Sequence, residues 1–237
     1  MRLLCWQSGL AGVAADETWR GVIARCSDNG VDLLVAPEFA VGGLPHSAAA
    51  ARASSLADPS ALVGLIEGAG PALNLVTGFT ERSGTGMYSS AALVREGRAR
   101  VVARKVHPRE PGISAGDLST TFDVAGMSCG VLICADARDP GLAANLRADG
   151  AQVLLCLLNN DMQHHTAAKW LAPTELALAD RARENNGWVV SADVAGWSTQ
   201  RRGLGATRIY GPDGHLRSAS SRISNTGILF DLPNFGT

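Results

Sequence analysis

A cysteine and a glutamate stand where two apolar runs end, and both side chains could carry chemistry. Cys134 follows the run GVLI at 130–133, and Glu38 follows the run LLVAP at 33–37. These runs are short and aliphatic, so each predicts a buried strand rather than a helix. A thiol at a strand end is a candidate nucleophile, and a carboxylate beside an apolar run is a candidate general base.

The residues after Cys134 suggest how the thiol is presented. Asp139 followed by Pro140 is typical of a helix N-cap and first helical position. We therefore expect Cys134 on a tight turn between a strand and a helix, where the positive helix end would lower the thiol pKa. Free cysteine is also commonly a small buried hydrophobic residue, and Cys156, inside a longer apolar run, is expected to be one.

Glu38 and Lys105 each have two interpretations when taken alone. Glu38 is either half-buried, with a raised pKa suited to proton transfer, or a loop glutamate that makes a surface contact. Lys105 lies in ARKVHP at 103–108, and a lysine in such a basic patch is usually solvated. Other polar residues at strand ends help to choose between the interpretations of Glu38, and Lys105 is interpreted together with Glu38 and Cys134.

Two further apolar runs end on polar residues. VLLCLLN at 153–159 ends on Asn159, and VVSAD at 189–193 ends on Asp193. In open α/β sheets, ligands bind beyond the carboxyl ends of the strands. This pattern predicts a site built partly from Glu38, Cys134 and Asn159.

Strand-like and helical patterns alternate along the chain without repeats or linkers, which favours one domain over residues 1–237. Glu96-Gly97 indicates a hairpin turn, and Pro173 is expected to kink or break a helix. We expect helices at 16–28, from Asp58-Pro59 to about Gly68, at 139–149 with Gly150 as C-cap, and at 165–186. We expect strands at the N-terminus and at 31–39, 73–79, 152–159 and 188–194, with short strands around the turn at 211–214.

Composition limits the class of protein. The chain has 237 residues, is 46% hydrophobic and 18% charged, and has a formal net charge of −1. This balance gives no electrostatic basis for binding nucleic acid or an anionic membrane, and no apolar stretch approaches the ~20 residues that span a bilayer. The N-terminal apolar patch is too short for a secretory signal, and the cysteines are odd in number and widely spaced, which favours reduced thiols. We expect a cytoplasmic protein.

Other motifs carry no convincing site. GISAG at 112–116 matches the G-x-S-x-G nucleophile motif, but prolines rather than a strand precede it, so we expect a loop. The five histidines lack metal-ligand spacing, and no glycine motif for phosphate or dinucleotide is present. We therefore expect no metal and no organic cofactor.

Glu38, Lys105 and Cys134 together resemble the catalytic set of the nitrilase superfamily of carbon–nitrogen hydrolases, in which glutamate, lysine and cysteine occur in this order. Glu110, the one glutamate between Lys105 and Cys134, resembles by position the second glutamate of that family. The matching motifs are LLVAPE at 33–38, RKVH at 104–107 and GVLICADAR at 130–138, followed by a helix–strand segment at 181–190 and a hairpin at 208–214.

The resemblance implies an α/β fold, a four-layer α-β-β-α sandwich, assembled as a homodimer or larger homo-oligomer. It implies that Cys134 attacks an amide carbonyl and that Glu38 is the general base. Lys105 and the backbone N–H of Ala135 would then stabilise the oxyanion, with Glu110 orienting the lysine. The Trp170-Leu171 region is a candidate for the subunit contact, or equally for the core.

The chain departs from the family at residues expected near the substrate. Ala103 and Ala135 stand where the family often has aromatic residues, which predicts a wider acyl pocket. Asn159 and Asn160 could hydrogen-bond a polar substrate or cap the following helix, and both interpretations are open.

Three functions are consistent with this sequence. The first is hydrolysis of a small-molecule amide, ω-amide or carbamoyl group, with a nitrile less favoured because most branches of the superfamily cleave amides. The second is acyl transfer, in which an amine replaces water at the thioester. The third is a catalytically silent binding or scaffold protein, which the intact Glu38, Lys105 and Cys134 argue against.

Overall fold

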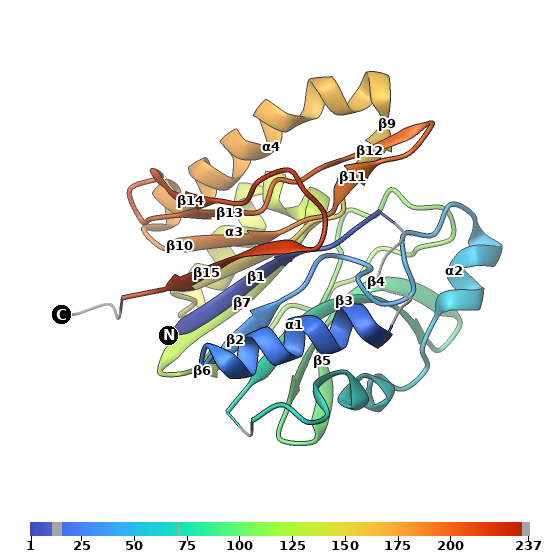
Figure 1. Cartoon of the computed structure of the whole chain (residues 1–237). Coiled ribbons are helices and arrows are strands. Elements are labelled where there is room, and N and C mark those ends of the chain that lie inside the picture. Colours follow the sequence, from blue (N-terminus) through green and yellow to red (C-terminus); the bar gives the residue numbers. More distant parts are fainter. Residues whose placement is uncertain (11–15, 71, 234–237) are drawn as a thin grey trace.

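Two six-stranded β-sheets form the centre of the computed structural model, which describes residues 1–10, 16–70 and 72–233. Figure 1 shows them between helices, with the first and last strands of the chain side by side. One sheet is ordered β15 (Thr226–Asp231), β1 (Arg2–Gln7), β2 (Leu33–Val35), β3 (Asn74–Ser83), β4 (Gly86–Arg95) and β5 (Arg98–Arg104). The other is ordered β14 (Leu216–Ala219), β13 (Arg208–Tyr210), β10 (Trp188–Ala192), β8 (Val153–Leu157), β7 (Met127–Ile133) and β6 (Phe122–Val124).

Each sheet has parallel strands at its middle and antiparallel strands at its edges. β1, β2 and β3 are parallel in one sheet, and β7, β8 and β10 are parallel in the other. Parallel neighbours need crossover connections, and helical segments provide them. The helical segments of the chain are α1 (Asp16–Asp28), α2 (Ala48–Ser54), the 3₁₀ helix η1 (Pro59–Ile66), the 3₁₀ helix η2 (Cys134–Arg138), α3 (Pro140–Ala148) and α4 (His164–Asn185).

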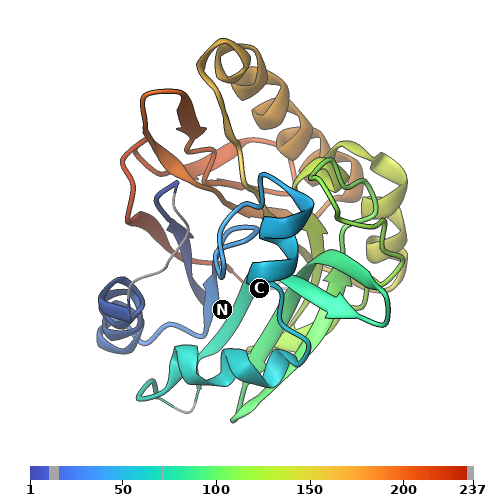
Figure 2. The same ribbon diagram turned by 90° about the vertical axis from the view of Figure 1, so that its right-hand side faces the viewer.

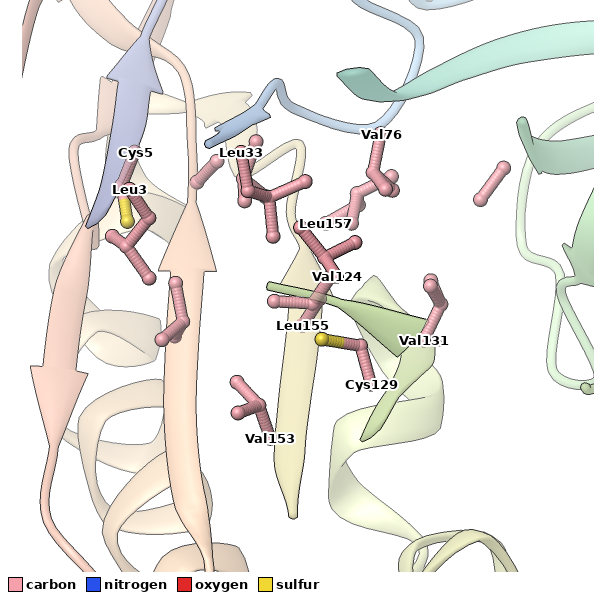
Figure 3. Packing of buried hydrophobic residues seen from close by; sticks show 14 of the residues in the cluster. Leu3, Cys5, Leu33, Val76, Val124, Cys129, Val131, Val153, Leu155 and Leu157 are labelled. Carbon is pink, nitrogen blue, oxygen red and sulfur yellow. The ribbon is translucent and has the colours of Figure 1, made fainter. Parts of the chain in front are cut away.

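Alternate residues of the parallel strands face opposite layers of the molecule. Along β8, Val153, Leu155 and Leu157 belong to the core between the sheets, whereas Leu154 and Cys156 face the helices outside. Figure 3 shows side chains of the inner layer from β1, β2, β3, β7 and β8 gathered in one cluster. Because a strand has a side-chain period of two, these wholly apolar runs can bury both faces.

The helices complete two outer layers. α1 and η1 pack on the outer face of the β1–β5 sheet through residues such as Trp19, Ile23 and Leu62. α3 and α4 pack on the outer face of the other sheet through residues such as Leu146 and Leu178. Figure 2, turned by 90°, shows these helices at the periphery and the strands between them. The four-layer α-β-β-α sandwich predicted from the sequence is confirmed.

Most predicted elements are present, with four differences. The strand predicted at 31–39 extends only over Leu33–Val35, and the chain turns at 38–40. The segment after Asp58 is a 3₁₀ helix, and Asp58 caps it by accepting from Ser60 N at 2.8 Å. Pro173 does not break α4, which continues to Asn185. The residues after the proline, such as Thr174 and Leu178, are buried. α2 was not predicted, because its alanine-rich sequence has no apolar stripe to mark it.

The turns and helix caps predicted from residue type are present where the backbone conformation requires that residue. The Glu96-Gly97 turn joins β4 to β5 with positive φ at both residues, as a tight hairpin requires. Asp139 caps α3, and Gly150 follows its end with a φ of 93°. The GISAG segment at 112–116 lies in a loop, as expected. A short sheet of β9 (Asp161–Gln163), β12 (Arg201–Leu204) and β11 (Ala195–Trp197) extends beyond β8 and β10.

Within the described residues, none of the helices is both long and apolar enough to cross a bilayer.

Candidate active site

The ends of strands from both sheets meet at one place. Glu38 lies in the turn after β2, Cys134 directly follows β7, and Asn159 lies just after β8. The sheets are joined there, because Glu38 N donates to Leu158 O at 3.2 Å and Asn159 Nδ2 donates to Glu38 O at 3.0 Å. The geometry therefore brings together the three residues that the strand-end pattern selected.

Lys105 completes the cluster from the end of β5. Its Nζ donates to Glu38 Oε1 at 2.8 Å and to Glu110 Oε1 at 2.7 Å, and the side chain is 1% exposed. Burial by itself disfavours the ammonium, but Glu38, Cys134 and Glu110 hold the pKa of Lys105 above its usual range. An ammonium has three protons to donate, so two carboxylate bonds leave one N–H available.

Glu38 is fully buried, which excludes the interpretation of a surface glutamate. Its Oε1 accepts from Lys105 and also from Ser89 Oγ, at 2.7 Å. Burial raises the pKa of Glu38 to about 7, although Lys105 and Ser89 act in the opposite direction. Its Oε2 has no hydrogen-bond partner among the described residues. A carboxylate that titrates near neutral pH, with one oxygen available, suits a general base.

Cys134 begins η2 with a φ of 50°, in the left-handed region that non-glycine residues rarely adopt. Such strain is typical of active-site residues held by their surroundings. The backbone N–H of Asn159 donates toward its sulfur. Cys134 lines a pocket, whereas the other four cysteines, Cys156 included, are buried and unbridged.

The expected lowering of the Cys134 pKa is wrong for this resting site. Burial raises the pKa of the thiol to about 12, and the opposing effect of Lys105 does not compensate. The helix that begins at Cys134 is the five-residue η2, not the longer α3 that the sequence suggested. The resting nucleophile is therefore a thiol, and a base must remove its proton during attack.

Asp136 joins the cysteine segment to the lysine segment. Its buried carboxylate accepts from Val106 N at 3.1 Å and from His107 N at 2.9 Å. Because these amides directly follow Lys105, the two hydrogen bonds fix where the lysine loop leaves β5. The sequence marked Asp136 as part of a motif but gave no sign of its partners.

A second carboxylate anchors the end of β5. Glu81 accepts two hydrogen bonds from Arg104, at 2.8 and 2.7 Å, and one from Ser90 Oγ at 2.6 Å. The Arg104 guanidinium also lies 4.6 Å from the centre of the Tyr88 ring. These contacts hold the residue before Lys105, and nothing in the spacing of the sequence indicated them.

A pocket of about 340 Å³ opens beside Cys134. It includes the predicted Ala135, Asn159 and Asn160, together with residues from two other loops, from η2, from β9 and from α4. Its walls are Leu44, Pro45, His46, Lys105, Arg109, Glu110, Pro111, Cys134, Ala135, Arg138, Asn159, Asn160, Asp161, Met162 and Trp170.

The two asparagines use their amides inside the protein. Asn160 Nδ2 donates to Asp193 Oδ2 at 3.0 Å, and Asn159 Nδ2 donates to the Glu38 carbonyl. Neither caps the following helix, since α4 has Gln163 at its N-cap without a side-chain bond. The capping interpretation is therefore wrong.

Two expectations about the pocket walls need correction. Ala103 is buried beside a separate cavity of about 410 Å³ and does not line the pocket at Cys134, so its small size does not widen the acyl site. Trp170 lies in the pocket wall, whereas the sequence suggested a subunit contact or core. Leu171 packs against the core beneath α4.

In the parts of the chain that the structure describes, no group of three or more His, Cys, Asp or Glu side chains is placed to hold a metal ion.

The chain was compared with known protein families. A model of the carbon-nitrogen hydrolase family matches residues 16–231. The chain belongs to this family. The sequence motifs that resemble the carbon–nitrogen hydrolases predicted this family.

Individual relatives are similar over most of the chain. It is 30% identical over 208 residues to the "hydrolase in pqqF 5′ region" of Pseudomonas protegens, covering 83% of this chain and 68% of that protein. It is 27% identical over 214 residues to a glutamine-dependent NAD(+) synthetase of Xanthomonas campestris, covering 84% of this chain. The chain spans only 37% of the length of that synthetase.

Solved structures share the fold. A cysteine-to-alanine mutant of the amidase of Nesterenkonia sp. AN1 superposes with a TM-score of 0.79 at 22% identity, covering 99% of this chain and 91% of that one. A mutant of the same amidase in complex with butyramide superposes with a TM-score of 0.74 at 22% identity, over 97% and 88% of the two chains.

Proposed function

We propose that this C–N hydrolase cleaves a small non-peptide amide through a thioester on Cys134. The observation that carries the proposal is the buried lysine held between Glu38 and Glu110, beside a partly exposed cysteine in a pocket. This arrangement supplies a nucleophile, a base and a cation within one cluster. The match to the carbon-nitrogen hydrolase family and the fold shared with the Nesterenkonia amidase support the same assignment.

In the first half-reaction, the Cys134 sulfur attacks the amide carbonyl carbon while its proton passes to Glu38, whose Oε2 is unpartnered among the described residues. The carbonyl oxygen becomes an oxyanion and accepts from the remaining N–H of Lys105. The N–H of Ala135 assists, because the first N–H groups of a helix such as η2 lack acceptors within it. Removal of one such donor typically costs ~3–4 kcal/mol in the transition state.

The intermediate then expels the nitrogen. Glu38 returns its proton to the departing ammonia or amine, and a thioester remains on Cys134. In the second half-reaction, Glu38 takes a proton from water, and the hydroxyl attacks the thioester. The carbon–sulfur bond breaks, Glu38 returns the proton to the departing sulfur, and a carboxylic acid and the Cys134 thiol are released. Glu110 keeps Lys105 charged and fixed through both steps, since its Oε1 accepts from Nζ at 2.7 Å.

The pocket supports a small acyl group rather than a peptide. Its volume of about 340 Å³ lies at the lower end of the range for small-molecule pockets, and a mutant of the Nesterenkonia amidase, which has the same fold, forms a complex with butyramide. Aliphatic amides, ω-amides and carbamoyl compounds are the substrate classes proposed.

Mass spectrometry of the intact protein tests the mechanism. After incubation with a panel of small amides, we expect an acyl adduct on Cys134 and released ammonia, both lost in Cys134→Ala. The matched control is Cys26→Ala, which removes a buried thiol on α1 and should keep both signals. If no amide gives an adduct or ammonia, the hydrolase mechanism is wrong and a silent scaffold is favoured. If an added amine captures the acyl group in preference to water, the enzyme is an acyl transferase.

Assembly and location complete the proposal. We propose a homodimer or larger homo-oligomer, and α4 offers the exposed Leu176, at 61%, for such a contact. Analytical ultracentrifugation of the purified chain tests this, and a monomer at micromolar concentration would contradict it. A reducing compartment such as the cytoplasm suits an enzyme whose nucleophile must stay a free thiol.

A further inference from the structure

Arg138 occupies an unusual electrostatic position in the pocket at Cys134. Its guanidinium lies 4.0 Å from the centre of the Trp170 ring, and both side chains line the pocket. Within the described residues, the Arg138 side chain makes no hydrogen bond and no ion pair. Four other buried or partly buried arginines each reach a carboxylate. These pairs are Arg104–Glu81, Arg181–Glu184, Arg201–Asp161 and Arg208–Glu175.

The other charges of the pocket are already paired. Lys105 is bound by Glu38 and Glu110, and Asp161 is bound by Arg201 at 2.9 Å. Arg109 lies at the pocket and, like Arg138, has no carboxylate on its guanidinium in the described chain. The two unpaired guanidinium groups therefore add positive charge to this part of the pocket.

The environment of Arg138 disfavours its charge. Burial lowers the pKa of Arg138. Cys134 acts in the opposite direction, and repulsion by Arg109 adds to the lowering. A buried or half-buried cation without a counter-ion is costly, so retention of one in a substrate pocket calls for an anion that arrives with the ligand.

We infer that Arg138, assisted by Arg109, binds a carboxylate of the substrate, so that the amide cleaved at Cys134 carries an anionic group at its other end. This inference rests on the proposed amidase function. The candidates are monoamides of small dicarboxylic acids and compounds in which a carbamoyl or amide nitrogen is linked to a carboxylate.

The geometry suits such a role. A guanidinium stacked on an aromatic ring keeps its in-plane N–H groups free, and these match the two oxygens of a carboxylate. Cys134 and Arg138 are the first and last residues of the five-residue η2, so a single short helix fixes the spacing between nucleophile and anion site. Substrate length is thereby selected together with charge.

Matched pairs of amides test the inference. We would measure kcat/KM by ammonia release for malonamate, succinamate and glutaramate, each against the corresponding diamide. Within a pair the two compounds differ only in a carboxylate or a carboxamide at the far end. We expect a preference of about tenfold or more for the anionic member at one chain length, weakened by salt.

Variants locate the preference in the structure. Arg138→Met should bring the ratio of the two kcat/KM values to near one, and Arg138→Lys should restore it in part, because charge returns without the planar fork. Arg20→Met, an exposed arginine on α1, is the matched control and should leave the ratio unchanged. A ratio near one in the unmodified enzyme, or a ratio that Arg138→Met leaves intact, overturns the anion site while the amidase function stands.

Binding to Cys134→Ala separates this inference from the reaction. By calorimetry, we expect this variant to bind one of the monoamides about tenfold more tightly than its diamide, and the addition of Arg138→Met to abolish the difference. If the unmodified enzyme hydrolyses none of the amides but this charge-dependent binding is present, the amidase proposal fails and the anion site is supported. Equal binding of both members in every pair overturns the anion site.

Discussion

Ser89 donates a hydrogen bond of 2.7 Å to Oε1 of Glu38, the same oxygen that Lys105 contacts at 2.8 Å. Both donors therefore act on one oxygen, and Oε2 is the buried oxygen without a partner among the described residues. The carboxylate is thus held in a fixed orientation with a single oxygen available for the proton of the nucleophile or of water. Ser89 works as a positioning residue for the proposed base.

Removal of the Ser89 hydroxyl should change the pH dependence of the enzyme. The hydroxyl stabilises the charged form of Glu38 and so lowers its pKa, which burial raises to about 7. In Ser89→Ala that pKa rises further. Because the base must be deprotonated, the acid limb of the kcat/KM profile should move to higher pH by about 1, the size expected for a hydrogen bond to a charged group.

The comparison variant is Ser27→Ala on α1, whose hydroxyl bonds only within its own helix. It should leave the pH profile in place. An unchanged acid limb in Ser89→Ala would show that Glu38 does not govern this ionisation.

Glu38→Gln should lose activity and gain stability. Loss of the general base should lower kcat by about 100-fold or more. The folded-state pKa of Glu38 lies above its unfolded value, so burial of its charge destabilises the wild type increasingly as pH rises toward and through about 7. The glutamine variant avoids this cost, and Lys105 keeps Glu110 as a partner.

Thermal unfolding at several pH values measures this effect. We expect the Tm advantage of Glu38→Gln to be larger at pH 8.5 than at pH 5.5. The exposed Glu67→Gln is the control and should show no pH-dependent gain. An advantage that shrinks as pH rises would mean that the Lys105 contact outweighs burial.

Asp136→Asn should loosen the lysine loop. Its carboxylate accepts from the amides of both Val106 and His107, whereas an asparagine amide has one oxygen and would direct an NH₂ group at the second N–H. A buried donor without an acceptor costs ~1–3 kcal/mol. We expect that loss in free energy of unfolding by urea, with a reduced kcat.

The exposed Asp28→Asn at the end of α1 serves as the control for Asp136→Asn. If both variants unfold at the same urea concentration as the wild type, the proposed link between the cysteine and lysine segments carries no energy.

Gly78→Ala should displace the proposed general base. A Cβ at Gly78 would lie 2.5 Å from Glu38 Cα and 2.7 Å from Phe39 N, and backbone atoms cannot move aside as a flexible side chain can. We expect a loss of about 2 kcal/mol or more in stability and a large loss of kcat.

A glycine in open surroundings provides the comparison. A Cβ at Gly21 on α1 would meet nothing within 4 Å, so Gly21→Ala should stabilise the helix by about 0.5–1 kcal/mol. Near-wild-type activity in Gly78→Ala would show that the Glu38 turn tolerates displacement.

Sequence patterns alone identify the residues that stand at the ends of strands. The runs before Glu38, Cys134 and Asn159 are apolar at every position because both faces of the strands are buried, and that pattern is local. Helix caps such as Asp139, and turns such as Glu96-Gly97, were also readable, because their backbone geometry depends on a few neighbouring residues.

The contacts and the ionisation of those residues depend on the three-dimensional fold. The partner of Glu38 is Lys105, and that of Asp136 is the loop after β5, and both contacts join segments distant in sequence. The thiol pKa went in the opposite direction from the prediction because desolvation outweighs the charge of Lys105 and the hydrogen bond from the Asn159 backbone. Among the described residues, Arg138 has no counter-ion. This also could not be predicted from a local sequence pattern, because it depends on all the residues that surround the side chain in the fold.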